Sequence, residues 1–268
     1  MKVETIGNRG LLFPFKDPFL TNVYVILGNE RVYVLDTFLG IDSMVFVKRE
    51  IREQGYDDLP VVVFNSHGDY DHYWGNAAFE DALIIGHELC RERILKEHEE
   101  AFQANEEQKK GDVILKPPSL VFTQRLSFPG DEITFYHTPG HTTDSATCWD
   151  NVDKVLFVGD NVETPLPYVY NTDLGGFHST LESFYRIFDW KVMIGSHAPA
   201  LYNRNLLDRN IKYLESLKDW NIDLSSLTKD ELHLHIHNIK YLAENIDNIS
   251  LREKAELHLE EMKKFTQH

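Results

Sequence analysis

Four side chains of the metal-binding type occur within six consecutive residues of this sequence. They are His67, Asp69, Asp71 and His72, and they follow the apolar run at residues 61–64. Histidine supplies a neutral nitrogen ligand and aspartate a charged oxygen ligand, and both are common at divalent metal ions. Because a short loop bends, residues spaced by two can converge on one ion while their neighbours reach a second. A single histidine in a loop is usually only hydrated, whereas this cluster indicates a metal site.

Three later segments repeat this arrangement, in which an apolar run ends at a loop with a histidine or an aspartate. The runs cover residues 133–136, 155–158 and 192–194, and the polar residues that follow them are His141, Asp160 and His197. Compact apolar runs of this kind are typical of buried strands. Layered α/β proteins usually build their sites just beyond strand ends. We therefore expect these three residues to join the cluster at residues 67–72.

The elements that must position these loops alternate between strands and helices. The apolar runs at residues 23–27 and 31–35 are separated by a turn-like Gly-Asn pair, which predicts a hairpin. Residues 42–53 show apolar side chains at helical spacing, and residues 87–110 are charged and helix-prone. This alternation predicts an α/β layered domain.

Beyond residue 204 the pattern changes to helix. We expect three helices at about residues 205–220, 228–246 and 250–267, from apolar residues at helical spacing. Thr228 with Glu231, and Ser250 with Glu253, have the spacing of a capping box at a helix start. The predicted organisation is a domain over residues 1–204 followed by a C-terminal helical extension over residues 205–268.

In their order along the chain, these motifs resemble those of the metallo-β-lactamase superfamily. The loop at residues 67–72 is similar to the family signature His-x-His-x-Asp-His, and Asp36-Thr37 resembles the early Asp-Thr of the family. Three further matches are His137-Thr138-Pro139-Gly140-His141-Thr142, Val158-Gly159-Asp160 and, more loosely, Gly195-Ser196-His197-Ala198. The resemblance covers roughly residues 20–200. It implies an αββα sandwich with a dinuclear metal site at one edge.

The resemblance also implies a role for each of these residues. The first metal ion would be held by His67, Asp69 and His141, and the second by Asp71, His72 and His197. Asp160 would bridge the two ions, and Asp36 would hold the loop from behind. Asp71 would also orient the attacking water and move its proton. His137 is expected to be a packed or hydrogen-bonded residue at a strand end, not a ligand.

The sequence departs from the family pattern at three places. Asp69 stands where the family usually has histidine, although a minority of members carry aspartate there. Asp144 stands where many members have glycine, and Ser196 is inserted before the final histidine. The C-terminal extension resembles no substrate module that we can name. Asp69 adds a negative charge to the site, and its oxygen shifts metal preference toward iron or manganese relative to an all-histidine first site.

Other residues with functional side chains are interpreted more simply. His233, His235 and His237 alternate along a predicted helix, and we interpret them as a solvated helix face. Tyr168 and Tyr170 follow Asp160 and are expected mainly to pack, although a bound substrate is within their reach. His178 is a weaker candidate for the pocket entrance.

Composition narrows the partners and the compartment. The chain has 27 Lys and Arg against 43 Asp and Glu, a formal net charge of −16, which repels phosphate backbones. Nucleic acid is therefore not an expected partner, and neither is a membrane, since no apolar run approaches membrane-spanning length. The two cysteines, Cys90 and Cys148, are expected to be reduced thiols. A cytoplasmic protein with a small-molecule substrate is predicted, and a homodimer stays open.

The predicted function is that of a dinuclear metal-dependent hydrolase. A hydroxide bridging two divalent ions, zinc first and iron or manganese as alternatives, would attack a small ester, thioester, lactone or related substrate. Two alternatives remain open. One is an iron-dependent redox enzyme of the same fold, and the other is a non-catalytic metal-binding protein. A nuclease is disfavoured by the net charge.

Overall fold

The computed structural model describes residues 2–265 and divides the chain into two compact units. The sheet unit comprises Met1–Thr138, Asp144–Gly159 and Phe188–Asn203. The helical unit comprises Pro139–Thr143, Asp160–Ile187 and Arg204–His268. Two segments that follow strands, the short one at residues 139–143 and the longer one at residues 160–187, therefore group with the C-terminal helices. The predicted division at residue 204 stays a prediction.

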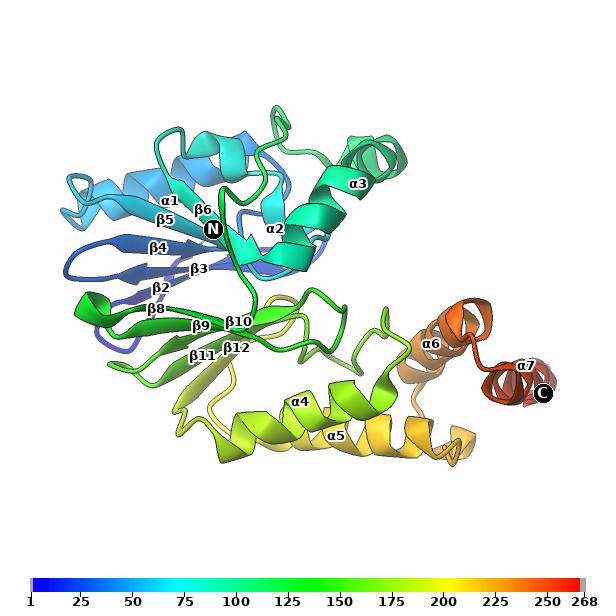
Figure 1. Ribbon diagram of the computed structural model, residues 1–268. Coiled ribbons are helices and arrows are strands. Elements are labelled where there is room, and N and C mark those ends of the chain that lie inside the picture. The colour runs from blue at the N-terminus through cyan, green and yellow to red at the C-terminus, as the bar shows by residue number, and fades with distance from the viewer. Residues whose placement is uncertain (1, 266–268) are drawn as a thin grey trace. The chain divides into compact units, whose positions relative to one another are not determined.

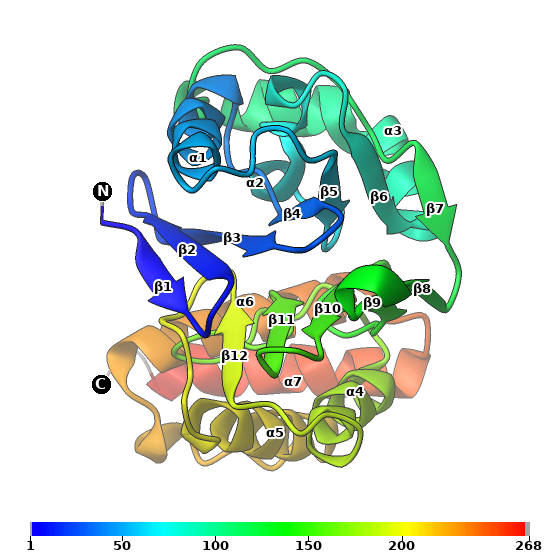
Figure 2. The ribbon, with the colours of Figure 1, turned by 90° about the vertical axis from the view of Figure 1, so that its left-hand side faces the viewer.

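The sheet unit contains a seven-stranded sheet, called sheet A, in which the strands lie side by side in chain order (Figure 2). Its strands are β1 (Glu4–Ile6), β2 (Gly10–Phe15), β3 (Thr21–Leu27), β4 (Val32–Leu35), β5 (Val61–Asn65), β6 (Leu83–His87) and β7 (Leu120–Phe122). Strands β1 to β4 pair antiparallel, which confirms the predicted hairpin of β3 and β4. Strands β4 to β7 pair in parallel. The loop after β5 therefore lies at the carboxyl edge of parallel strands.

A second sheet of five strands, sheet B, completes the framework of this unit. Its order is β12 (Val192–Gly195), β11 (Val155–Gly159), β10 (Ala146–Asp150), β9 (Ile133–His137) and β8 (Arg125–Phe128). All pairs are antiparallel except β11 with β12, which run in parallel and end together at Gly159 and Gly195. The predicted strands at residues 133–136, 155–158 and 192–194 are confirmed.

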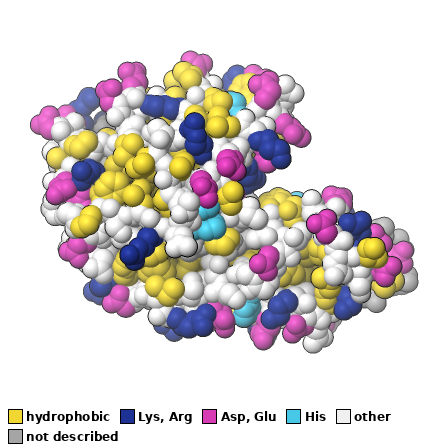
Figure 3. Space-filling view, viewed as in Figure 1, with side chains coloured by type: hydrophobic (Ala, Val, Ile, Leu, Met, Phe, Trp, Pro, Cys, Tyr) yellow, Lys and Arg dark blue, Asp and Glu magenta, His cyan; other side chains and the backbone are white. Residues whose placement is uncertain are grey.

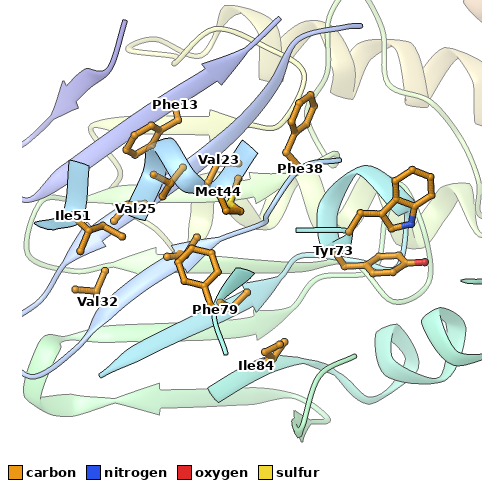
Figure 4. Close-up of a cluster of buried hydrophobic side chains, with 14 of the residues drawn as sticks. Phe13, Val23, Val25, Val32, Phe38, Met44, Ile51, Tyr73, Phe79 and Ile84 are labelled. Carbon is orange, nitrogen blue, oxygen red and sulfur yellow. The ribbon is translucent and has the colours of Figure 1, made fainter. Parts of the chain in front are cut away.

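Two apolar cores hold the sheet unit together. One lies between the sheets, where Tyr24 and Phe64 of sheet A pack with Phe135 and Phe157 of sheet B. The other lies on the outer face of sheet A, beneath α1 (Ile41–Glu53) and α3 (Glu88–Asn105), and Figure 4 shows part of it. In β3, Val23, Val25 and Leu27 face the outer core while Tyr24 and Ile26 face the inner one. Every residue of β3 is therefore buried, as the two-residue repeat of a covered strand requires.

Helices cover sheet A within this unit. Figure 1 shows α1 and α3 on its outer face and sheet B on its inner face. Helix α1 confirms the predicted helix at residues 42–53, and α3 lies inside the helix-prone stretch at residues 87–110. The short helix α2 (Tyr70–Tyr73) begins inside the loop of candidate ligands. Single 3₁₀ turns occur at Asn76–Ala78, Glu106–Gln108 and Pro129–Asp131.

The helical unit contains α4 (Leu174–Arg186), α5 (Asn205–Lys218), α6 (Lys229–Asn245) and α7 (Ile249–Phe265), with a 3₁₀ turn at Leu224–Ser226. Helix α4 packs against α5, and α6 packs against α7. The three predicted C-terminal helices are confirmed, although residues 266–267 of the last one lie outside the described residues.

One of the two predicted capping boxes is present. The Thr228 hydroxyl accepts a hydrogen bond from the N–H of Glu231, whose carboxylate accepts one from the N–H of Thr228. The predicted box of Ser250 with Glu253 is wrong, because α7 already begins at Ile249. The Asn248 side chain accepts from the N–H of Leu251 instead, so asparagine one residue earlier satisfies this helix end.

Candidate metal centre

The loop of candidate ligands leaves β5 with its backbone fixed on both sides. The Ser66 carbonyl accepts a hydrogen bond from the N–H of Ala146 at 2.8 Å, and the His72 carbonyl accepts from the N–H of Thr37 at 3.0 Å. The Asn65 side chain donates to the same His72 carbonyl at 3.0 Å. The loop is thus tied to sheet B, to the end of β4 and to itself.

Asp36 is the buried anchor of this loop. Its Oδ1 accepts from the N–H of Ser66 at 2.8 Å, and its Oδ2 accepts from the Ser66 hydroxyl at 2.8 Å and from Nδ1 of His72 at 2.7 Å. Asp36 adopts a φ of 59°, a left-handed conformation that is uncommon outside glycine. The loop-holding role expected for Asp36 agrees with these three contacts.

Three candidate ligands of the sheet unit form one group. Single ligand atoms of Asp71, His72 and His197 all lie within 4.8 Å of one another. Oδ2 of Asp71 is 3.4 Å from Nε2 of His72 and 3.4 Å from Nε2 of His197. Asp71 and His72 are buried, and His197 is partly buried. The group assigned to the second metal ion is therefore assembled from the β5 loop and the end of β12.

The turn that carries His197 is held by the N-terminal strands. The Asn22 side chain donates to the carbonyls of Gly195 and Ala198 at 2.8 and 2.7 Å. Nδ1 of His197 donates to the Leu20 carbonyl at 2.6 Å. The ring is thereby oriented with Nε2 toward Asp71.

His67 and Asp69 form a second pair in the sheet unit. Nε2 of His67 lies 3.0 Å from Oδ2 of Asp69, while Oδ1 of Asp69 contacts the guanidinium of Arg93 on α3. His67 is buried and Asp69 is partly buried. The unusual carboxylate thus faces His67 with one oxygen and an arginine with the other.

The helical unit holds the other two candidates, His141 and Asp160. Nε2 of His141 is 3.8 Å from Oδ2 of Asp160, and Nδ1 of His141 is 3.6 Å from Oε2 of Glu163. All three side chains are buried. The Asn161 side chain accepts from the N–H of His141 at 2.9 Å. A Cβ at Gly140 would lie 2.3 Å from that same Asn161 oxygen, so only glycine fits there.

A segment after Glu163 fixes the imidazole of His141. The Tyr168 carbonyl accepts from Nδ1 of His141 at 3.1 Å, and the N–H of Tyr170 donates to the His141 carbonyl at 2.9 Å. The Glu163 carboxylate accepts from the N–H of Tyr168 at 2.8 Å. Asn238 of α6 completes the support, since it accepts from the N–H of Val169 and donates to the Pro167 carbonyl. Helix α6 therefore reaches His141 through residues 167–169.

Aromatic rings gather beside His141 within this unit. Tyr170 meets His141 edge-on, with ring centroids 5.2 Å apart, and lies parallel to Tyr168 at 6.1 Å. His237 and Tyr241 of α6 pack edge-on against Tyr170 at 5.4 Å each. These ring contacts agree with the packing role expected for Tyr168 and Tyr170, and Tyr168 is exposed at 36% of its surface.

All four candidate histidines have an oxygen partner at Nδ1. Nδ1 of His67 faces the Ser66 hydroxyl at 3.0 Å, and that hydroxyl already donates to Asp36, so it accepts from the ring. Nδ1 of His72, His141 and His197 faces a carboxylate or a carbonyl oxygen, as described above. In the neutral imidazole, a proton on Nδ1 leaves a lone pair on Nε2. Partners of this kind fix metal-binding histidines in the tautomer that coordinates.

The atoms opposite these lone pairs suit a divalent cation. Each of the four Nε2 atoms faces a carboxylate oxygen, at distances from 3.0 to 3.8 Å. Two electron-rich atoms held so close repel unless a cation or a proton lies between them. A tetrahedral ion with bonds of 2.0–2.1 Å places its ligands about 3.4 Å apart, which matches the two 3.4 Å separations around Asp71. The residues present therefore fit a metal centre.

Two histidines outside the candidate set are explained by packing. His137 stacks on His87, with ring centroids 3.7 Å apart and planes at 9°, and His87 binds the Thr123 carbonyl. This agrees with a packed strand-end role for His137. Burial is the main cause that lowers the pKa of His87.

The interpretation of His235 as part of a solvated helix face is wrong. His235 is fully buried, its Nδ1 lies 3.0 Å from the Tyr213 hydroxyl, and its Nε2 lies 3.1 Å from Nε2 of His258 on α7. Burial, with His258 as the second cause, lowers the pKa of His235 to about 3. Only His233 of the three is exposed.

Three residues at the site were not identified from the sequence. Glu163 had an available signal, because it lies three residues after Asp160 in the same strand-end loop. No local sequence pattern distinguishes Arg93 or Asn238 from the other residues of their helices, since each contacts residues that are distant in the sequence. Their roles depend on contacts that only the fold creates.

Comparison with known families and structures agrees with these observations. The family profile described as the metallo-beta-lactamase superfamily matches residues 17–220. No curated protein matches the chain. A solved metallo-beta-lactamase from Hirschia baltica has a TM-score of 0.62 at 15% identity, over 80% of this chain and 97% of that one.

A metallo-beta-lactamase from Pontibacter korlensis has a TM-score of 0.61 at 18% identity, over 80% of this chain and 98% of that one. At such identities the structures show a shared fold. The two facing sheets with flanking helices are those of the αββα sandwich, and C-terminal helices are present in addition. Since the family profile spans most of the sequence, the chain belongs to the metallo-beta-lactamase superfamily.

Proposed function

We propose that this protein is a dinuclear metal-dependent hydrolase of small esters, thioesters, lactones or related substrates. Membership in the superfamily supports metal-dependent hydrolysis. The observation that carries the proposal is that four buried or partly buried imidazoles each present Nε2 to a carboxylate. Such a set of donors suits divalent cations, which would relieve the repulsion between each Nε2 lone pair and its carboxylate.

The proposed ligand set has seven residues. The first ion would be held by His67, Asp69 and His141, the second by Asp71, His72 and His197, and Asp160 would contribute to both. The assignment of His141 and Asp160 to the same centre as the others rests on the order of the sequence motifs. We propose zinc as the first choice of metal, because zinc accepts both imidazole and carboxylate ligands.

The residues have distinct tasks in the proposed reaction. When bound, the divalent ions supply an acidified water and polarise the attacked group. Asp71 would help to hold the second ion, because its Oδ2 lies 3.4 Å from Nε2 of His72 and from Nε2 of His197, and its carboxylate would orient the water and take up a proton. The Thr21 hydroxyl lies 3.5 Å from the same Oδ2 and helps to hold it. His72 and His197 keep their ring positions through Asp36 and the Leu20 carbonyl.

An iron-dependent redox enzyme is the second candidate, and Asp69 is the observation that favours it. A carboxylate oxygen next to His67 makes the first site harder than an all-histidine one, which suits iron or manganese. Iron as the major metal of the purified protein, with oxygen consumption and no hydrolysis, would support this candidate over the first.

The net charge and the state of the two cysteines support the proposal of a small substrate and a cytoplasmic location. The formal charge of −16 opposes nucleic acid, and Figure 3 shows Lys and Arg interspersed with Asp and Glu on the viewed face. Cys90 and Cys148 are buried and not paired with each other, as in a reducing compartment. Among the described residues, no helix combines the length and apolar character needed to cross a membrane.

The test combines elemental analysis of the purified protein with a panel of esters, thioesters, lactones and phosphodiesters. We expect two divalent ions per chain and turnover that disappears in Asp71→Asn. His137→Ala is the matched control, since it removes another strand-end histidine, which stacks on His87 and is not one of the proposed ligands. Full metal occupancy without turnover on any substrate would instead indicate a non-catalytic metal-binding protein.

A further inference from the structure

Arg93 of α3 has each of its three guanidinium nitrogens opposite a different carboxylate. Nε lies 3.0 Å from Glu97, Nη1 lies 3.4 Å from Asp144, and Nη2 contacts Oδ1 of Asp69. The aliphatic stem packs on the ligand loop, because a Cβ at Gly68 would lie 3.3 Å from three of its carbons. One side chain thus joins α3, the ligand loop and the segment before β10.

The same contacts fix how Asp69 is presented. Asp144 accepts from the N–H of Gly68 at 2.7 Å with one oxygen and faces Arg93 with the other, so the loop backbone is clamped beside Asp69. Of the two Asp69 oxygens, Oδ1 is engaged by Arg93 and Oδ2 points to Nε2 of His67. Only one oxygen is therefore directed toward the histidine.

The electrostatic effect of Arg93 opposes that of Asp69. A carboxylate in place of the usual imidazole adds one negative charge, and the guanidinium beside it adds one positive charge. The Arg93 and Asp69 side chains are only 25% and 22% exposed, so solvent screens the pair less than on an open surface. Burial alone would lower the pKa of Arg93, but Asp69, Asp144 and Glu97 raise it above its ordinary value.

We propose that Arg93 is a positioning residue for the metal centre, which confines Asp69 to one-oxygen coordination of the first ion and offsets its charge. The aspartate at position 69 and the arginine at position 93 then form one functional unit that replaces a histidine. This inference rests on the proposed function, because it takes Asp69 as a metal ligand.

The test is a double-mutant cycle on the full-length protein, stripped of metal and titrated with Zn²⁺ against a chromophoric chelator. Arg93→Met is expected to weaken Zn²⁺ binding about tenfold, as loss of an outer partner of a ligand does. In the Asp69→His background the same change is expected to cause no weakening, because Asp69 is the one proposed ligand among the three carboxylates that Arg93 contacts. Equal weakening in both backgrounds, or none in either, would overturn the proposal.

Three controls separate positioning from general damage. Arg91→Met removes a cation from the same helix whose contact is the Pro118 carbonyl, and Zn²⁺ affinity is expected to be unchanged. Arg93→Lys keeps the charge but loses the three guanidinium nitrogens that contact three carboxylates, so its Zn²⁺ affinity is expected to lie between those of the unmodified protein and Arg93→Met. The absorption spectrum of the Co²⁺-loaded protein is expected to change in Arg93→Met, because Asp69 is released to coordinate with both oxygens.

Metal affinity and turnover are read separately in this design. If the cycle shows the coupling but no substrate is hydrolysed, the proposed function fails and the role of Arg93 stands. If substrates are hydrolysed but the two residues are uncoupled, only the role of Arg93 fails. Thermal unfolding of each variant verifies that the compared proteins are folded.

Discussion

Nδ1 of His72 donates to Oδ2 of Asp36 across 2.7 Å, and both side chains are fully buried. The same carboxylate also accepts hydrogen bonds from the N–H and the hydroxyl of Ser66, so Asp36 fixes both the position of the ligand loop and the orientation of the His72 ring. We expect Asp36→Ala to lower metal affinity about 10- to 100-fold, as loss of such partners does elsewhere. Titration of the metal-free variant measures this, and an affinity equal to that of the unmodified protein would contradict it.

Asp160 is proposed to bridge the two ions, and it lies 3.8 Å from His141. Asp160→Ala is expected to empty at least one metal site, because a bridging ligand contributes to both. Elemental analysis of the purified variant measures the occupancy. Glu163→Gln is a useful comparison, since it changes a neighbouring carboxylate that faces Nδ1 of His141 and not Nε2. Two ions per chain in Asp160→Ala would refute the bridging role.

Asn238 links α6 to the segment that fixes the His141 ring. Asn238→Ala is expected to lower metal affinity several-fold while leaving the group of Asp71, His72 and His197 in place. Asn245→Ala is the matched control, because Asn245 lies on the same helix but is exposed and donates to the Tyr241 carbonyl. The Co²⁺ spectrum should change in the first variant alone, and identical spectra would argue against the link.

Buried His235, which faces the partly buried His258, makes the stability of the fold depend on pH. The pKa of His235 is about 3 in the folded chain, against about 6.5 when unfolded. The unfolded state therefore takes up the proton first, and stability present above pH 6.5 falls as the pH drops toward 3. Between pH 7 and pH 5 this histidine costs about 2 kcal/mol of folding free energy.

His235→Gln is expected to remove most of that acid sensitivity. Urea unfolding at the two pH values measures the free energy of each protein. His233→Gln, an exposed histidine of the same helix, serves as the control and should keep the full dependence. If all three proteins lose the same stability on acidification, buried His235 is not its source.

The fold and most of the site were predictable from local patterns. β-branched runs such as residues 61–64 specify covered strands, and turn residues such as Gly195 specify where they stop. The position of His235 was not predictable in this way. Neighbours two apart in a helix differ by about 200° in direction, so alternating histidines cannot share one face, and the middle one faces the core. The roles of Arg93 and Asn238 could not be predicted either, because their partners are distant in sequence.

The support that Asn238 gives to residues 167–169 has a consequence for biosynthesis. A chain emerges from the ribosome from its N-terminus, so every proposed metal ligand is synthesised before α6 exists. During that interval the Val169 N–H and the Pro167 carbonyl lack the side chain that later binds them. The residues Asp71, His72 and His197 are therefore all present before α6 is made, whereas the support that Asn238 gives to the segment holding the His141 ring exists only after α6 has folded.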